Sequence, residues 1–185
     1  MPAQKKITVL FLCTGNSCRS QMAEGWTRHL KRNLVEAHSA GVNPKGVDPR
    51  AVKAMAETGV DISKQGSKSL DEIRHIEFDY VITLCDNAHK TCPIFPAKTR
   101  VMHVGFEDPP RLAEKAKDEE EAMAHYRRIR DEIRVFVDGL PERLFSEESG
   151  ISANQQLLFE SGIESFLNQM PKEHLHESDD REEDK

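Results

Sequence analysis

Residues 7–19 read ITVLFLCTGNSCR, an apolar run that ends in a cysteine and reaches an arginine six residues later. Ile7 to Leu12 are aliphatic or β-branched and have the length of a buried strand. From Ser20 onward the residues Gln, Met, Ala and Glu are good helix formers. Gly15 and Asn16 tolerate left-handed backbone, so successive N–H groups can point inward at the start of the helix. The stretch therefore predicts a strand, an oxyanion-binding loop and a helix.

Cys13, at the end of the strand, is the candidate nucleophile of this loop. The amide dipoles and the guanidinium of Arg19 favour the ionised thiol, which is the reactive form. A lone cysteine at a strand end is more often a small buried hydrophobe, but that alternative does not explain Arg19. The residues that we expect to hold the anion follow the nucleophile directly: Thr14, Gly15, Asn16, Ser17, Cys18, Arg19 and Ser20.

Composition narrows the class of protein. The chain has 185 residues, four cysteines and a net charge of -6. It has no apolar stretch of about 18 residues, and its first residues, MPAQKK, lack the apolar region of a signal peptide, so we expect a cytoplasmic protein with no membrane partner. Cysteines without an export signal are expected to be reduced thiols. The absence of a basic stripe argues against nucleic acid as a partner.

Strand and helix patterns alternate along the chain. Further strands are predicted at residues 35–39, 80–84 and 100–105, and helices at 51–57, after the N-cap Asp48, and at 119–137. Ser69 and Glu72 form a capping box that opens a short helix. This alternation predicts an α/β fold with a four-stranded parallel sheet flanked by helices.

The C-terminal part has a different pattern. Residues 154–170 carry a helix-like apolar face interrupted by Gly162, and nearly all residues after Met170 are charged. The sequence thus predicts a main domain at residues 1–139, a helical extension at 140–170 and a charged tail at 171–185.

Three reactive side chains follow predicted strands. Cys13, Cys85 and Asp108 each lie just beyond a strand end, and in a parallel sheet these ends share the edge where ligands bind. Asp108 precedes Pro109 and is either a simple turn former or a general acid; its place at this edge favours the acid.

Cys85 and Cys92 form a second cysteine pair. In one rigid helix their sulfur atoms would lie about 10 Å apart along the axis, too far for a disulfide, so a bond between them requires the segment to bend. Asp86, Asn87 and Pro93 favour such a labile segment. A zinc site is the alternative, but the six-residue gap between the cysteines is unusual for zinc, and Arg19 opposes a dication. We therefore expect no metal.

With these residues in view, the chain resembles a known family. The motif CTGNSCRS at residues 13–20 with a later Asp-Pro is similar to the low-molecular-weight protein tyrosine phosphatase superfamily. Within it, CTGNSCRSQMAEGW together with VITLCDNAHKTCP resembles the thioredoxin-coupled arsenate reductases, over about residues 5–138. The aromatic residues that hold a phosphotyrosyl ring in the phosphatases are missing, since those places read Pro110-Arg111 and VNPKGVDP.

The resemblance implies a chemistry for each cysteine. Cys13 would attack arsenic while Arg19 and the loop hold the oxygens, and Asp108 would protonate the departing hydroxyl. Cys85 would then attack Cys13 and release arsenite, and Cys92 would attack Cys85, leaving a disulfide for thioredoxin to reduce. Arsenate and thioredoxin are thus the implied partners, and no cofactor is needed.

The resemblance also implies which residues hold the loop in its shape. Asn16, Ser39 and Glu24 match positions that organise the loop in the family, where some members bind potassium through them and a further carboxylate. Lys68 stands at the place of that carboxylate, so its ammonium group is expected to substitute for the ion.

Two other functions remain open from the sequence. A low-molecular-weight protein tyrosine phosphatase or small-molecule phosphatase would use Cys13, Arg19 and Asp108 but leave Cys85 and Cys92 idle. A thiol-based redox sensor or partner-binding module would be oxidised once, without turnover on arsenate.

Overall fold

The computed structural model describes residues 6–146, and these contain one four-stranded sheet. The strands are β1 (Ile7–Cys13), β2 (Val35–Gly41), β3 (Tyr80–Thr83) and β4 (Arg100–His103). Their order in the sheet is β2-β1-β3-β4, and all neighbouring pairs are parallel. The predicted α/β fold is confirmed.

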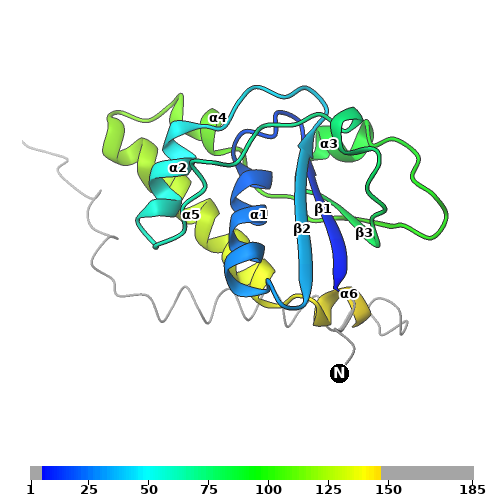
Figure 1. Ribbon diagram of the computed structural model, residues 1–185. Coiled ribbons are helices and arrows are strands. Elements are labelled where there is room, and N and C mark those ends of the chain that lie inside the picture. The colour runs from blue at the N-terminus through cyan, green and yellow to red at the C-terminus, as the bar shows by residue number, and fades with distance from the viewer. Residues whose placement is uncertain (1–5, 147–185) are drawn as a thin grey trace, which may run out of the picture. The chain divides into compact units, whose positions relative to one another are not determined.

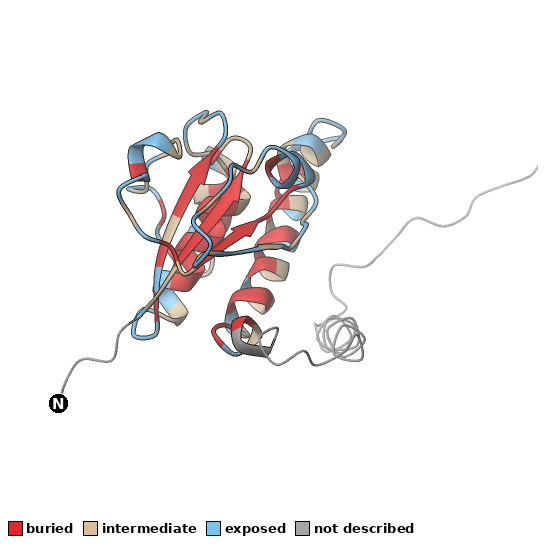
Figure 2. Ribbon diagram, turned by 90° about the vertical axis from the view of Figure 1, so that its right-hand side faces the viewer, coloured by how far each residue is buried: buried red, intermediate tan, exposed pale blue. Residues whose placement is uncertain are grey.

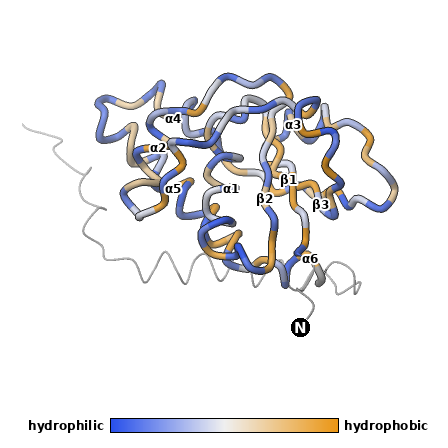
Figure 3. Tube along the Cα trace, in the orientation of Figure 1, coloured by the Kyte–Doolittle hydropathy of each residue, from blue (hydrophilic) through white to orange (hydrophobic). Residues whose placement is uncertain are grey.

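Strand β1 lies inside the sheet and is buried on both faces. Val9, Leu10, Phe11 and Leu12 are fully buried, which explains their unbroken apolar run. Figure 2 shows the buried residues concentrated in the strands. Figure 3 shows hydrophobic residues running through β1 and β3, whereas the helices alternate between hydrophilic and hydrophobic residues.

Three longer helices pack together beside the sheet (Figure 1): α1 (Arg19–Leu30), α2 (Pro49–Ala56) and α5 (Glu119–Asp138). Helix α1 contacts β1, β2 and α5, and α5 also contacts α2. The apolar positions predicted for α5 are buried: Met123, Tyr126, Ile129, Ile133, Phe136 and Val137. Asp48 caps α2 as predicted, accepting hydrogen bonds from the amides of Arg50 and Ala51. No helix within residues 6–146 is long and apolar enough to cross a membrane.

The remaining helical elements are short. They are a 3₁₀ turn η1 (Asp71–Ile73), α3 (Asp86–Lys90), α4 (Pro109–Ala113) and α6 (Glu142–Ser146). One of the two hydrogen bonds of the predicted capping box is present, since the Glu72 carboxylate accepts from the backbone N–H of Ser69 at 2.6 Å; the reciprocal bond is missing, and the residue at the N-cap of η1 is Leu70. Helix α4 begins where the sequence suggested only a loop, because Pro109 and Pro110 fit the first turn of a helix.

The core continues past Gly139, where the sequence placed the end of the main domain. Leu140 and Leu144 are 0% and 1% exposed, and the Tyr80 hydroxyl donates to the Leu144 carbonyl at 3.3 Å. The first compact unit accordingly includes residues up to 147. The helix expected at residues 154–170 and the charged tail at 171–185 lie outside the described residues.

Candidate active site

The loop after β1 owes its shape to backbone hydrogen bonds with the segment at residues 42–48. Four loop carbonyls accept hydrogen bonds from backbone N–H groups of that segment, and Asn16 has a positive φ of 43°. Because these carbonyls point toward the segment, the N–H groups of the loop can point toward the centre of the loop. A bound anion needs N–H donors at that place. The bonds run from Val42 to Cys13 at 3.2 Å, Asn43 to Thr14 at 2.8 Å, Lys45 to Gly15 at 3.0 Å and Asp48 to Ser17 at 2.9 Å.

The sulfur of Cys13 lies inside this loop and is only 3% exposed. The backbone N–H of Asn16 donates to Cys13 Sγ at 3.2 Å, and Ser20 Oγ lies 2.8 Å from the same sulfur. Two of the residues that were expected to hold the anion, Asn16 and Ser20, therefore contact the candidate nucleophile. Hydrogen-bond donors at this distance stabilise negative charge on sulfur.

The side chain of Asn16 organises the loop. It is fully buried, and its Nδ2 donates to Ser20 Oγ at 2.9 Å and to Ser39 Oγ at 2.8 Å. Its Oδ1 accepts from the backbone N–H of Lys68 at 2.7 Å, which fixes the orientation of the amide. Since Ser20 Oγ accepts a hydrogen bond from the Asn16 amide, its own hydroxyl proton is available to donate to Cys13.

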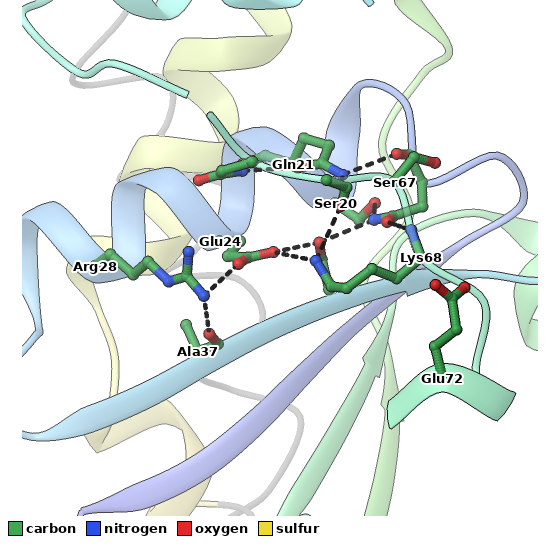
Figure 4. A network of polar contacts seen from close by, with 12 residues as sticks. Ser20, Gln21, Glu24, Arg28, Ala37, Ser67, Lys68 and Glu72 are labelled. Atoms are coloured by element: carbon green, nitrogen blue, oxygen red, sulfur yellow. Dashed lines mark hydrogen bonds and ion pairs between the residues drawn. The ribbon is translucent and has the colours of Figure 1, made fainter. Parts of the chain in front are cut away.

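Glu24 closes the other end of this network (Figure 4). Its carboxylate is 1% exposed; it accepts a hydrogen bond from Ser39 and lies 2.5 Å from the guanidinium of Arg28. Lys68 Nζ lies 3.8 Å from Glu24 Oε2 and also donates to the Gly66 carbonyl at 2.9 Å. A buried carboxylate needs such cationic partners. The ammonium group of Lys68 thus lies beside the Glu24 carboxylate, and its replacement of a potassium ion stays a prediction.

Arg19 and Asp108 meet at the mouth of the loop. Arg19 Nη2 lies 2.9 Å from Asp108 Oδ1, and Arg19 Nη1 donates to the Phe106 carbonyl at 2.8 Å. The side chain of Arg19 is 11% exposed and that of Asp108 is 41% exposed, so the carboxyl group faces an open pocket of about 560 Å³. The pocket is lined by Arg19, Cys85, Asp86, Gly105, Phe106, Glu107, Asp108, Arg111, Leu112 and Lys115.

Cys85 lies directly against the loop. Its Sγ is 3.3 Å from Thr14 Oγ1, and Asn87 Nδ2 donates to the same oxygen at 3.0 Å. Cys85 is buried and caps α3 by accepting from the backbone N–H of Ala88 at 3.4 Å. The three residues that the sequence placed at the edge of the sheet are thus linked to one site, Cys85 through Thr14 and Asp108 through Arg19.

Cys92 follows α3 and is partly exposed. Helix α3 ends at Lys90, so the segment from Cys85 to Cys92 is not a rigid two-turn helix and the spacing of about 10 Å derived for one does not apply. All four cysteines are free. Burial raises the pKa of the Cys92 thiol, and burial together with the nearby Asp48 raises that of Cys18 well above its usual value. A protonated, buried Cys18 fits a structural role.

A pair of histidines beside α3 was not predicted from the sequence. The rings of His89 and His103 stack with centroids 4.6 Å apart, and both Nδ1 atoms face Thr83 Oγ1, at 3.4 and 2.9 Å. His103 Nε2 also lies 3.3 Å from Asp86 Oδ1. Within residues 6–146, no three His, Cys, Asp or Glu side chains form a group that could hold a metal ion.

Gly41 is a second feature that the sequence did not single out. A Cβ at this position would lie 2.7 Å from Asn16 N and 2.9 Å from Thr14 O, both backbone atoms of the loop. We expect Gly41→Ala to destabilise the fold by about 1–3 kcal/mol in urea denaturation and to weaken anion binding, because the loop must move. Gly66→Ala is the matched control, since its Cβ meets nothing within 4 Å. Equal stability of both variants would contradict the close approach.

The fold and the loop together define a class of protein. Residues 8–149 match the family model described as low molecular weight phosphotyrosine protein phosphatase, and the chain belongs to this family.

The similar proteins within the family that are described next are named arsenate reductases. An arsenate reductase of Bacillus licheniformis is 49% identical over 129 residues, which cover 69% of this chain and 90% of the relative. The crystal structure of an arsenate reductase from Archaeoglobus fulgidus aligns with a TM-score of 0.57 at 32% identity, covering 71% of this chain and 97% of the other. A thioredoxin-dependent arsenate reductase of Corynebacterium glutamicum aligns at 0.52 and 30% identity, covering 72% and 61%.

Proposed function

We propose that this protein reduces arsenate to arsenite and is regenerated by thioredoxin. The observation that carries the proposal is the contact between Cys85 and Thr14, which places a second thiol against the loop of the first. A phosphatase needs one thiol, an arginine and an acid, whereas a reductase needs a further thiol within reach of the first. The names of the relatives support the same activity.

The first step uses the anion loop. The Cys13 thiolate attacks arsenic, Arg19 and the loop amides hold the oxygens, and Asp108 donates a proton to the oxygen that leaves as water. Asp108 shares Arg19 with the incoming anion, so binding of the anion loosens this ion pair and lets the carboxylate take up from water the proton that it then donates.

A reductive attack by Cys85 and later thiol–disulfide exchanges complete the cycle. Cys85 attacks the sulfur of Cys13, the sulfur–arsenic bond breaks with its electron pair on arsenic, and arsenite leaves as arsenic(V) becomes arsenic(III). Cys92 then attacks Cys85, which frees the Cys13 thiolate and forms the Cys85–Cys92 disulfide. A thioredoxin dithiol reduces that disulfide and is itself oxidised. We place this cycle in the cytoplasm, because it requires reduced thiols at its start.

A coupled assay tests the proposal. Protein, arsenate, thioredoxin, thioredoxin reductase and NADPH are combined, and NADPH oxidation and arsenite release are followed together. We expect one NADPH consumed per arsenite, and no consumption without thioredoxin. Oxidation of the protein without repeated arsenite release would instead indicate a redox sensor, and hydrolysis of an aryl phosphate with no arsenite at all would indicate a phosphatase.

The raised pKa of Cys92 gives a testable expectation for the reduced protein. Because burial disfavours its thiolate, Cys92 should react with iodoacetamide more slowly at pH 7 than the same residue in urea-unfolded chains, and the difference should shrink as the pH rises. Peptide mapping after timed alkylation measures the rate at each cysteine. A native rate at pH 7 equal to the unfolded rate would contradict this expectation.

A further inference from the structure

The pocket in front of Arg19 is much larger than a single inorganic oxyanion requires. Its volume of about 560 Å³ lies within the range of about 300–1,000 Å³ that is typical of pockets for organic ligands. Arg19 is the part of the anion loop that lines the pocket, and α4 with the turn after it forms another side: Arg111, Leu112 and Lys115 all line it. Space thus remains beyond the oxyanion for the rest of a larger molecule.

The carboxylates of this pocket all have partners. Asp108 pairs with Arg19 at 2.9 Å, and Asp86 faces His103 at 3.3 Å. Glu107 pairs with Arg128, which lies outside the pocket lining, at 2.7 Å. None of these three carboxylates is therefore paired with Arg111 or Lys115.

Two positively charged side chains of the pocket, in contrast, have no ion-pair partner among the described residues. Arg111 and Lys115 are exposed, and neither has an ion pair with any of residues 6–146. They stand four residues apart, and the turn continues between them because the backbone N–H of Lys115 donates to the Leu112 carbonyl at 3.1 Å. This spacing places both on one side of the turn. The pocket therefore carries two positive charges that no carboxylate in it neutralises.

We propose that Arg111 and Lys115 form a second anion subsite, which selects small organic phosphomonoesters that carry an additional acidic group. The phosphate would occupy the Arg19 loop, so this inference rests on the anion-binding role assigned above, and the acidic group would face Arg111 and Lys115. Phe106 and Leu112 line the space between and offer apolar contact to a short carbon chain. Such compounds would compete with arsenate for Arg19.

The matched ligands 3-phosphoglycerate and glycerol 3-phosphate test the subsite, because they differ in a carboxylate against a hydroxymethyl group. Isothermal titration of the reduced full-length protein measures both affinities without any turnover. We expect 3-phosphoglycerate to bind about tenfold or more tightly, as one charge-assisted hydrogen bond allows. The double variant Arg111→Gln, Lys115→Gln should lower this affinity ratio about tenfold. Lys117→Gln removes one positive charge from a nearby exposed residue outside the pocket lining and should leave the ratio unchanged.

The outcomes separate this inference from the proposed function. Equal affinities for the two ligands, or a ratio that the double variant does not change, would overturn the subsite even if arsenate is reduced. An equal fall of the ratio in the Lys117 variant would show a general effect of charge and would also overturn it. A large ratio lost only in the double variant, in a protein that fails to reduce arsenate, would support the subsite and refute the reductase.

Discussion

Replacing Cys92 by serine should stop repeated arsenate reduction while the protein still releases one arsenite per chain. Without Cys92 the disulfide between Cys13 and Cys85 cannot be passed on, so Cys13 stays blocked after one cycle. Steady-state turnover should fall by more than about a thousandfold, the scale on which loss of a reacting group slows an enzyme. Cys85→Ser should release no arsenite, because the adduct on Cys13 then has no thiol to attack it.

Hydrolysis of a small aryl phosphate by the same variants is the internal control. Attack at phosphorus needs Cys13, Arg19 and Asp108 but neither of the other two thiols, so the slow hydrolysis should persist in both serine variants. Arsenite is counted in a rapid-mixing experiment, and phosphate release is followed separately. Loss of both activities together in Cys92→Ser would mean that this cysteine supports the loop structurally, and the cascade would have to be abandoned.

The sequence predicted the parts of the fold that carry a periodic or apolar pattern. Strand β1 and helix α5 were found at nearly the predicted residues, because their burial imposes an unbroken apolar run in one and steps of three and four residues in the other. The short helices α3 and α4 were not delimited. Helices of five residues contain too few positions to show a period, and their stability comes from packing.

The candidate site, too, could be predicted only where its residues are close together in the sequence. The residues from Cys13 to Ser20 form a local motif, so the loop could be predicted from sequence spacing, whereas the contact of the Asn16 N–H with the sulfur became visible only in the structure. The backbone bonds from residues 42–48 leave no trace in side-chain identity, because any residue except proline can supply an N–H. The stacked rings of His89 and His103 come from two different elements, and only the pairing of β3 with β4 brings them together.

Asp108→Asn should slow formation of the Cys13 adduct by about two to four orders of magnitude, the usual contribution of general acid catalysis. The amide keeps the size of the carboxyl group but cannot give up a proton, and it removes the ion pair with Arg19 seen at 2.9 Å. Since that pair competes with the anion for Arg19, the variant should bind sulfate at least as tightly as the parent protein does. A slower reaction with undiminished binding separates a proton donor from a residue that merely shapes the loop.

The measurement is arsenite release in a single turnover, with excess protein so that thioredoxin plays no part. Glu107→Gln is the matched control, because this neighbouring carboxylate lines the same pocket but pairs with Arg128, away from Arg19. We expect its single-turnover rate to stay within about a factor of ten of the parent rate, since rim charges act mainly on association. Asp108→Asn with a parent-like rate, where adduct formation limits the reaction, would leave Asp108 only its position before the first turn of α4.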